Sequence, residues 1–233
     1  MPESNPESQA ARAAGVDGSD RARFIRAATR LLPAPAVPTI HLYTADEATD
    51  LWEKTEAELG RTGLPPPFWA FPWAGGQALA RYLIEHPETV RGRTVLDVAS
   101  GSGLVAIAAA RAGAARTWAN DIDPFAQAAL GLNAAVNGVD VEPLHGDRVG
   151  SDAGWDVVLA GDVSYERDMA ERLLGWFEVL RHRGARVMIG DPGRSYLPRH
   201  RLRELAAYDV PVPRALEDAD VKRAAVWELV PPR

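Results

Sequence analysis

The sequence contains no cysteine, few histidines and no long apolar run. Without cysteine the chain has no disulfide, no thiol nucleophile and no Cys-ligated zinc or iron–sulfur site. Its five histidines are scattered and lack the H-x-x-x-H spacing of zinc enzymes, so we expect no metal site. No stretch approaches the roughly 18 apolar residues that a membrane span needs, and we expect no membrane partner.

The chain also has little lysine, with two lysines against 24 arginines, and its formal net charge is −6. This acidic balance argues against a nucleic-acid partner, which usually leaves a basic footprint. We interpret the arginine excess mainly as compositional bias. Because the first residues show no apolar leader pattern, we expect a cytoplasmic protein, and we expect it to act as a monomer.

Composition divides the chain into three parts. Residues 1–20 are rich in small and charged residues and predict a disordered tail. Residues 21–75 form an N-terminal extension with a short helical segment, a strand near 40–43, a helix near 45–59 and the extended aromatic stretch LPPPFWAFPWAGG. Residues 76–233 form the main domain.

Strand and helix patterns alternate along the main domain. Helices are predicted at 76–86, 104–112, 124–137, 167–181 and 199–207, and strands at 94–98, 116–121, 140–144, 156–161, 185–190, 208–212 and 222–230. This spacing predicts an α/β fold with a doubly wound, mostly parallel seven-stranded sheet. The last two strands have no helix between them, so we expect an antiparallel C-terminal hairpin.

A glycine-rich loop, LDVASGSGLVA, follows the first strand of this domain. Gly101 and Gly103 satisfy the G-x-G-x-x-G/A pattern of dinucleotide binders, and Asp121 lies where an NAD-binding acid is expected. Asp97 argues against that interpretation, because a carboxylate at the strand end repels a pyrophosphate. A ligand with an amino group and a sulfonium favours this carboxylate.

VLDVASGSGLVAIAAARAGA and ANDIDPFAQAALGLNAAVNG resemble motifs I and II of the seven-β-strand methyltransferases, which have a Rossmann-like fold and use S-adenosylmethionine (SAM). The resemblance implies that Asp97 receives the ammonium of the methionine part and that Asp121 receives the ribose hydroxyls. The cofactor-binding residues of the loop are then Ala99, Ser100, Gly101 and Gly103. Ile122 flanks the adenine, and Asp147 accepts from its amino group. Asp123 with Pro124 is better interpreted as a helix N-terminus.

Residues 64–194 further resemble the protein-lysine methyltransferases of the β subunit of electron transfer flavoprotein. The likeness includes PFWAFPWAGG, GDVSYERDMA and VMIGDPGR. It implies that Trp73, Gly75 and Gly76 cover the cofactor and that Gly161 contributes to the same site. Asp162 and Tyr165, the D-x-x-Y element, are then the catalytic residues at the acceptor entrance. The implied partner is a protein substrate, the β subunit of electron transfer flavoprotein.

Methyl transfer from a sulfonium is an in-line displacement, so alignment carries most of the catalysis. A nearby carboxylate raises the pKa of a lysine, so Asp162 orients the amine instead of deprotonating it. We expect Trp69, Trp73 and Tyr165 to offer aromatic faces to the cationic groups. We expect Phe68 and Phe71 to anchor the N-terminal segment, and the arginines of 181–203 to form a solvated face or to meet an acidic protein surface.

Three other functions remain open at this point. The first is methylation of another protein, such as a ribosomal protein, or of a small amine such as nicotinamide. The second is a SAM-binding scaffold without activity, against which the complete D-x-x-Y element argues. The third is an NAD-dependent oxidoreductase, which Asp97 disfavours.

Overall fold

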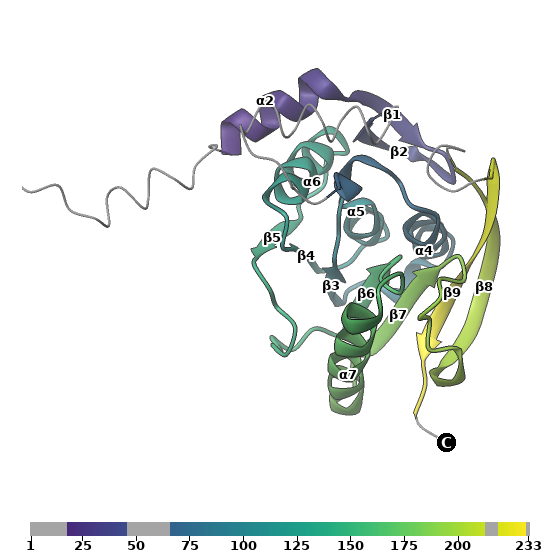
Figure 1. Ribbon diagram of the computed structural model, residues 1–233. Coiled ribbons are helices and arrows are strands. Elements are labelled where there is room, and N and C mark those ends of the chain that lie inside the picture. The colour runs from purple at the N-terminus through teal and green to yellow at the C-terminus, as the bar shows by residue number, and fades with distance from the viewer. Residues whose placement is uncertain (1–17, 46–65, 213–218, 232–233) are drawn as a thin grey trace, which may run out of the picture.

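The computed structural model describes residues 18–45, 66–212 and 219–231 (Figure 1). The strands are β1 Arg30–Ala34, β2 Val37–Thr44, β3 Thr94–Val98, β4 Arg116–Asp121, β5 Glu142–His145, β6 Val157–Gly161, β7 Arg186–Asp191, β8 Leu202–Pro211 and β9 Val221–Leu229. The helices are α2 Gly18–Ala28, α4 Ala74–Glu85, α5 Leu104–Arg111, α6 Pro124–Val136 and α7 Arg167–Arg183, with 3-10 turns η1 Phe68–Ala70, η2 Pro87–Thr89 and η3 Arg199–Arg201.

The main sheet has seven strands in the order β5-β4-β3-β6-β7-β9-β8. The first five strands of this order are parallel, and β9 runs antiparallel to both β7 and β8. The predicted α/β class, the seven strands and the C-terminal hairpin are therefore confirmed. The hairpin is inserted so that β9, not β8, continues the sheet from β7.

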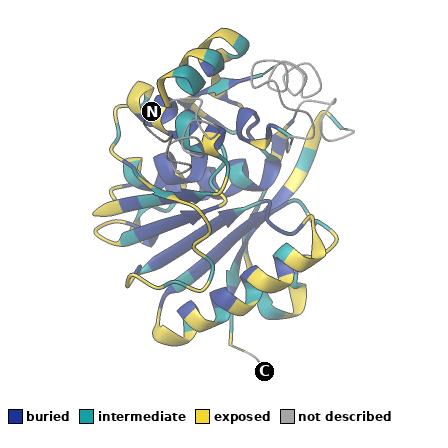
Figure 2. Ribbon diagram, turned by 60° about the vertical axis from the view of Figure 1, so that its left-hand side comes forward, coloured by how far each residue is buried: buried dark blue, intermediate teal, exposed yellow. Residues whose placement is uncertain are grey.

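Helices cover both faces of the sheet (Figure 1). On one face, alternate strand residues such as Val95 and Leu159 pack with α4 and α5, and α6 continues this layer over β4 and β5. On the other face, Leu96 and Val158 pack with Leu173 and other residues of α7. Figure 2 shows the parallel strands buried between these layers, as expected for strands with apolar residues on both faces.

A second, two-stranded sheet lies beside the main domain. β1 and β2 pair as an antiparallel hairpin that follows α2, and this unit packs against α6 (Figure 1). The strand predicted near 40–43 is part of β2, whereas β1 was not predicted. The helix predicted at 45–59 lies outside the described residues.

The prediction of a disordered tail over 1–20 is wrong for its last three residues, which open α2; residues 1–17 lie outside the described part. α2 is held by Ile25, which is fully buried against Trp69 and Phe125. An ion pair between Asp20 and Arg23 within its first turns adds local support.

The predicted helix at 199–207 is also wrong. The chain forms the short turn η3 and then enters the ten-residue strand β8. The sequence RLRELAAY has good helix formers, but β8 pairs with β9 along almost its whole length. The hydrogen bonds between β8 and β9 outweigh the local helix propensity, and β8 also shields the buried residues of β9 from water.

No helix in the described ranges combines the length and the apolar character needed to cross a membrane.

Candidate active site

The parallel strands bring most of the predicted site residues to one edge of the sheet. Asp97 lies near the end of β3, Asp121 ends β4, Gly161 ends β6 and Asp191 ends β7. The carboxyl ends of parallel strands point to the same crevice, where α/β proteins bind their ligands. The following loops add Asp147 and Asp162 to this edge.

The loop between β3 and α5 adopts the left-handed conformation three times. Ala99, Gly101 and Gly103 have φ angles of 52°, 51° and 81°. The φ angle of Gly103 favours glycine, and a Cβ there would also displace the Cδ1 methyl of Leu130, which would lie 2.5 Å away. Ala99 costs about 1 kcal/mol in this region, so backbone strain is stored in the predicted cofactor loop.

Asp97 and Asp121 both hold this loop. The buried Asp97 accepts a hydrogen bond from the backbone N–H of Ala106 at 3.0 Å. Asp121 accepts from Gly101 N–H at 2.8 Å and from Asp123 N–H at 2.9 Å. Burial and then the neighbouring charge of Asp121 raise the pKa of Asp97 well above its usual value, and burial raises the pKa of Asp121.

The two predicted adenine contacts differ in their surroundings. Ile122 is 74% exposed and is therefore available to a flat apolar ligand. Asp147 is exposed and bonded to Arg172 at 2.5 Å and to Val149 N–H at 3.0 Å. Arg172 lowers the pKa of Asp147, so this carboxylate is charged and already engaged. As predicted, Asp123 caps α6 by accepting from Phe125 N–H at 2.8 Å.

The glycines of α4 lie against the sheet backbone. A Cβ on Gly75 would stand 2.2 Å from the carbonyl oxygen of Gly190 and 2.6 Å from Asp162 Oδ2. A Cβ on Gly161 would stand 2.8 Å from the Cα of Gly76. These glycines therefore let the start of α4 contact β6 and β7 directly. Gly190, which sequence reasoning did not single out, belongs to the same packing.

Asp162 is fixed through its backbone and both carboxylate oxygens. Its φ angle is 56°, in the left-handed region that aspartate tolerates better than most residues. Its Oδ2 accepts from Gly76 N–H at 3.0 Å and its Oδ1 accepts from the Arg194 guanidinium at 2.9 Å. Burial raises its pKa to about 6, although Arg194 pulls it down.

Arg194 is a site residue that sequence reasoning placed only at the rim, without a role. It follows β7 in the DPGR sequence, and its backbone N–H donates to the buried Asp191 at 2.7 Å. Its guanidinium lies 5.9 Å from the centre of the Trp73 ring. In the sequence, the DPGR stretch that contains Arg194 and resembles the lysine methyltransferases was the feature that pointed to this residue.

An aromatic cluster of Phe68, Trp73 and Tyr165 lies next to Arg194, the partner of Asp162. Phe68 packs 5.8 Å from Trp73 and 5.7 Å from Tyr165. Phe68 and Tyr165 are 41% and 50% exposed, and the Asp121 charge contributes to the raised pKa of Tyr165, after burial. The influence of Asp121 on Tyr165 indicates that this ring lies near the carboxyl end of β4.

The other two aromatics of the segment belong to the core. Trp69 is 2% exposed and stacks on Phe125, so it offers no free face to a ligand, contrary to the prediction. Phe71 is buried in the same cluster and anchors the segment as predicted. Phe68 instead lies at the entrance, so the anchoring prediction for it is wrong.

The arginine-rich segment 181–203 is largely paired within the chain. Five of these arginines form ion pairs with acidic residues of this chain. The pairs are Arg183 with Asp152, Arg186 with Glu228, Arg194 with Asp162, Arg201 with Glu178, and Arg203 with Glu228. This pairing accounts for much of the segment without an acidic partner.

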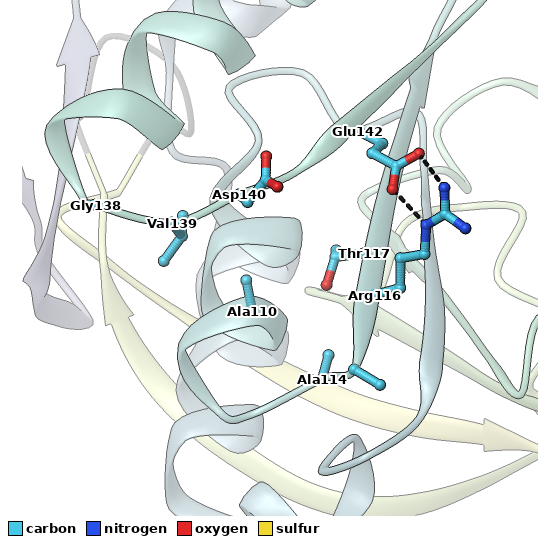
Figure 3. A pocket seen from close by; sticks show the side chains of 9 residues that line it. Ala110, Ala114, Arg116, Thr117, Gly138, Val139, Asp140 and Glu142 are labelled. Atoms are coloured by element: carbon cyan, nitrogen blue, oxygen red, sulfur yellow. Dashed lines mark hydrogen bonds and ion pairs between the residues drawn. The ribbon is translucent and has the colours of Figure 1, made fainter.

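A hollow of about 320 Å³ lies at the opposite end of the strands (Figure 3). It is lined by the start of β4, by Gly138 to Asp140 and by the ion pair of Arg116 with Glu142. Because ligands of parallel α/β sheets bind at the carboxyl ends, we do not assign the site to this hollow.

The residues at the carboxyl edge fit SAM. Two buried or nearly buried carboxylates with raised pKa values lie side by side, and a cationic ligand would stabilise their charged forms. The buried hydroxyl of Ser100 in the loop has no hydrogen-bond partner, which suits a polar ligand group. No group of residues arranged to hold a metal ion occurs in the described part of the chain.

Comparison with known proteins agrees with this geometry. The family model of ribosomal protein L11 methyltransferase matches residues 78–162. The chain is 40% identical to the electron transfer flavoprotein beta subunit lysine methyltransferase of Mus musculus, over 79% of this chain and 71% of the relative. It is 35% identical to the protein of that name from Xenopus laevis, over 89% of this chain and 86% of the relative.

Among solved structures, Thermoplasma acidophilum 1320 superposes with a TM-score of 0.51 at 19% identity, covering 66% of this chain and 89% of that one. That likeness supports the fold alone. The sequence relatives decide the family. The chain belongs to the electron transfer flavoprotein beta subunit lysine methyltransferase family and is a SAM-dependent methyltransferase.

Proposed function

We propose that this enzyme methylates lysine side chains of the β subunit of electron transfer flavoprotein. The observation that carries the proposal is the position of Asp162 and Tyr165 beside the edge that holds Asp97 and Asp121. In this arrangement the residues proposed to bind the cofactor lie next to the residues proposed to receive the acceptor lysine. The named relatives match over most of this chain, so their likeness includes both halves of the site.

In this proposal, the cofactor lies against the loop 99–103. Asp97 receives its ammonium, Asp121 its ribose hydroxyls, and Ile122 its adenine face. Asp147 stays at the rim with Arg172, where one of its oxygens can still accept from the adenine amino group. When bound, SAM supplies an electrophilic methyl group on a sulfonium.

Glycines and Trp73 shape the cover of this crevice. Gly75, Gly76 and Gly161 keep the start of α4 in backbone contact with the sheet. This contact places Gly76 N–H on the Asp162 carboxylate. Trp73 donates its indole N–H to the carbonyl of Phe68 at 2.9 Å, which fixes the ring near the entrance. We assign these residues to the cover and the positioning of Asp162.

At the acceptor side, Asp162 orients the lysine amine and Tyr165 contacts it through its hydroxyl or ring face. The amine must lose its proton first, because the unperturbed pKa of lysine is about 10.4. The neutral amine then attacks in line, and alignment by these side chains accelerates the step. The exposed rings of Phe68 and Tyr165 suit the aliphatic part of a lysine side chain.

Ribosomal protein L11 is the second candidate acceptor, because the L11 methyltransferase model matches residues 78–162. This match contains Asp97, Asp121 and, as its last residue, Asp162, but it ends before Tyr165 and Arg194. It therefore supports the cofactor half of the site and only the first residue of the acceptor half, whereas the lysine methyltransferase relatives cover the rest. This difference favours electron transfer flavoprotein.

We also propose that the enzyme acts as a monomer in the cytoplasm and has no nucleic-acid partner. The acidic net charge of −6 supports the last point. The absence of cysteine is compatible with a reducing compartment.

The proposed function is tested by incubating the purified protein with labelled SAM and either electron transfer flavoprotein or ribosomal protein L11. We expect label on lysines of the flavoprotein β subunit, located by mass spectrometry, and transfer lowered on the order of 100-fold with the Asp162→Asn variant. Label on L11 alone would assign the enzyme to the second candidate. Size-exclusion chromatography with light scattering tests the monomer.

A further inference from the structure

Two buried carboxylates and one arginine meet at the acceptor entrance. Asp162 directly follows strand β6, and Asp191 ends the adjacent strand β7. Their exposed fractions are 7% and 1%, respectively. Arg194 bonds the first through its side chain and the second through its backbone N–H. The arginine side chain is itself only 21% exposed, so this pairing takes place largely away from water.

The pairing changes what Asp162 presents to an acceptor. An unpaired carboxylate next to a lysine amine stabilises the ammonium form and raises the pKa of the amine. The ammonium has no lone pair for methyl transfer. A guanidinium on the same carboxylate cancels most of that effect while leaving the oxygens in place to orient the amine.

Other charged groups near the entrance do not provide this compensation. Asp191 from β7 adds negative charge near Asp162, and Asp121 from β4 and Glu166 at the start of α7 add negative charge near Tyr165. Gly76 N–H from α4 contributes only a dipole. Arg194 supplies positive charge directly to the Asp162 carboxylate.

We propose that Arg194 is a positioning residue for methyl transfer: it fixes the Asp162 carboxylate and neutralises it, so that an entering lysine amine is oriented without being held in its protonated form. The ammonium first loses its proton to water. The neutral nitrogen then gives its lone pair to the methyl carbon, and the electrons of the broken carbon–sulfur bond remain on sulfur. This role rests on the proposed function, in which Asp162 faces a lysine.

Two substitutions separate charge from shape. Arg194→Gln removes the charge, and Arg194→Lys keeps it while losing the two-nitrogen contact with Asp162. Arg167→Gln is the matched control, because Arg167 lies at the same rim over the Tyr196 ring, 5.0 Å from its centre. SAM binding by calorimetry and the melting temperature are measured on each variant to confirm an intact fold.

The first measurement needs no acceptor. Carbon-13 NMR of the aspartate carboxyls follows the titration of Asp162 in the full chain, identified by its loss in Asp162→Asn. We expect Arg194→Gln to raise the pKa of Asp162 above its value of about 6, and Arg194→Lys and Arg167→Gln to change it less. An unchanged titration in Arg194→Gln overturns the proposal whatever the acceptor is.

The second measurement is the pH dependence of single-turnover transfer to the flavoprotein. In Arg194→Gln the acid limb of the profile should move up by roughly one to three pH units, with recovery at high pH. Arg194→Lys should stay close to the parent profile with a lower rate. Equal slowing of both variants at all pH values would show a merely structural role. If the parent itself labels no flavoprotein, the proposed acceptor fails, and the carboxyl titration still tests Arg194.

Discussion

The side-chain amide of Asn133 donates a 2.8 Å hydrogen bond to the carbonyl oxygen of Ser102. The oxygen of the same amide accepts from the backbone N–H of Tyr43 at 2.8 Å. Asn133 is fully buried in α6, so one side chain joins the predicted cofactor loop to strand β2. The N-terminal hairpin is therefore mechanically linked to the cofactor site.

We predict that Asn133→Ala weakens both SAM binding and the fold. The substitution leaves a buried carbonyl and a backbone N–H without partners, at a cost of about 1–3 kcal/mol each. Asn137→Ala is the control, since Asn137 bonds the hairpin residue His41 and its own helix and, within the described residues, makes no bond to the cofactor loop. It should lower the melting temperature slightly and leave affinity unchanged. Equal SAM affinity of the Asn133 variant and the parent in calorimetry would contradict the link.

Asp121→Ala should weaken SAM binding severely. In the proposed site the variant loses two charge-assisted ribose hydrogen bonds, on the order of 1.5–3 kcal/mol each. It also loses the bond that holds Gly101 N–H. Asp140→Ala, at the other end of the sheet beside the hollow in Figure 3, is the matched control. Calorimetric affinity within error of the parent for the Asp121 variant would remove Asp121 from the cofactor site.

Asp162→Asn should lower methyl transfer on the order of 100-fold while SAM affinity stays nearly unchanged. In an asparagine, an NH2 donor replaces one of the two carboxylate oxygens, so the side chain no longer accepts from both Gly76 N–H and Arg194. Tyr165→Phe should fall between this variant and the parent. Single-turnover assays and SAM binding are measured on the same preparations. Full transfer activity in Asp162→Asn would exclude Asp162 from the chemistry.

Gly75→Ala should destabilise the enzyme by about 1–3 kcal/mol, because the added methyl group meets the Gly190 carbonyl and Asp162. It should also reduce transfer by moving Asp162. Gly131→Ala in the middle of α6 meets nothing within 4 Å and should be neutral or stabilising by about 0.5–1 kcal/mol. Denaturant unfolding of the two variants provides the measurement. Similar stabilities would argue against close packing at Gly75.

The ligand-free protein should lose stability as the pH rises from about 4, the unfolded pKa of an aspartate, through about 6. Burial raises the pKa of Asp123 and of Asp162 to about 6, and that of Asp97 well above its usual value. A carboxyl whose pKa is higher in the folded state favours folding when protonated, and this contribution is lost as the pH passes its folded pKa. Denaturant unfolding at several pH values measures this, and Asp97→Asn should flatten the slope. A rise in stability over this pH range would contradict it.

Local sequence patterns were enough to predict the central part of the fold. The strand at 116–121 was predicted with its observed bounds, and the helix after Asp123 began where the Asp-Pro pair placed it. Apolar runs, glycines and capping residues act within a few positions along the chain, so the sequence reveals them directly. The D-x-x-Y and glycine-loop residues likewise lie at strand ends that the pattern locates.

Only the tertiary structure decided the features that depend on distant contacts. β8 is a strand because β9 pairs with it, although its residues favour a helix. Asp162 and Arg194 are 32 positions apart in the chain. They pair because the strands that precede them, β6 and β7, are neighbours in the sheet. Gly190 faces Gly75 because helix α4 packs against β7. The sequence determined which chemical groups are available, and long-range packing decided which of them meet, since burial and hydrogen bonding across the fold outweigh local preference.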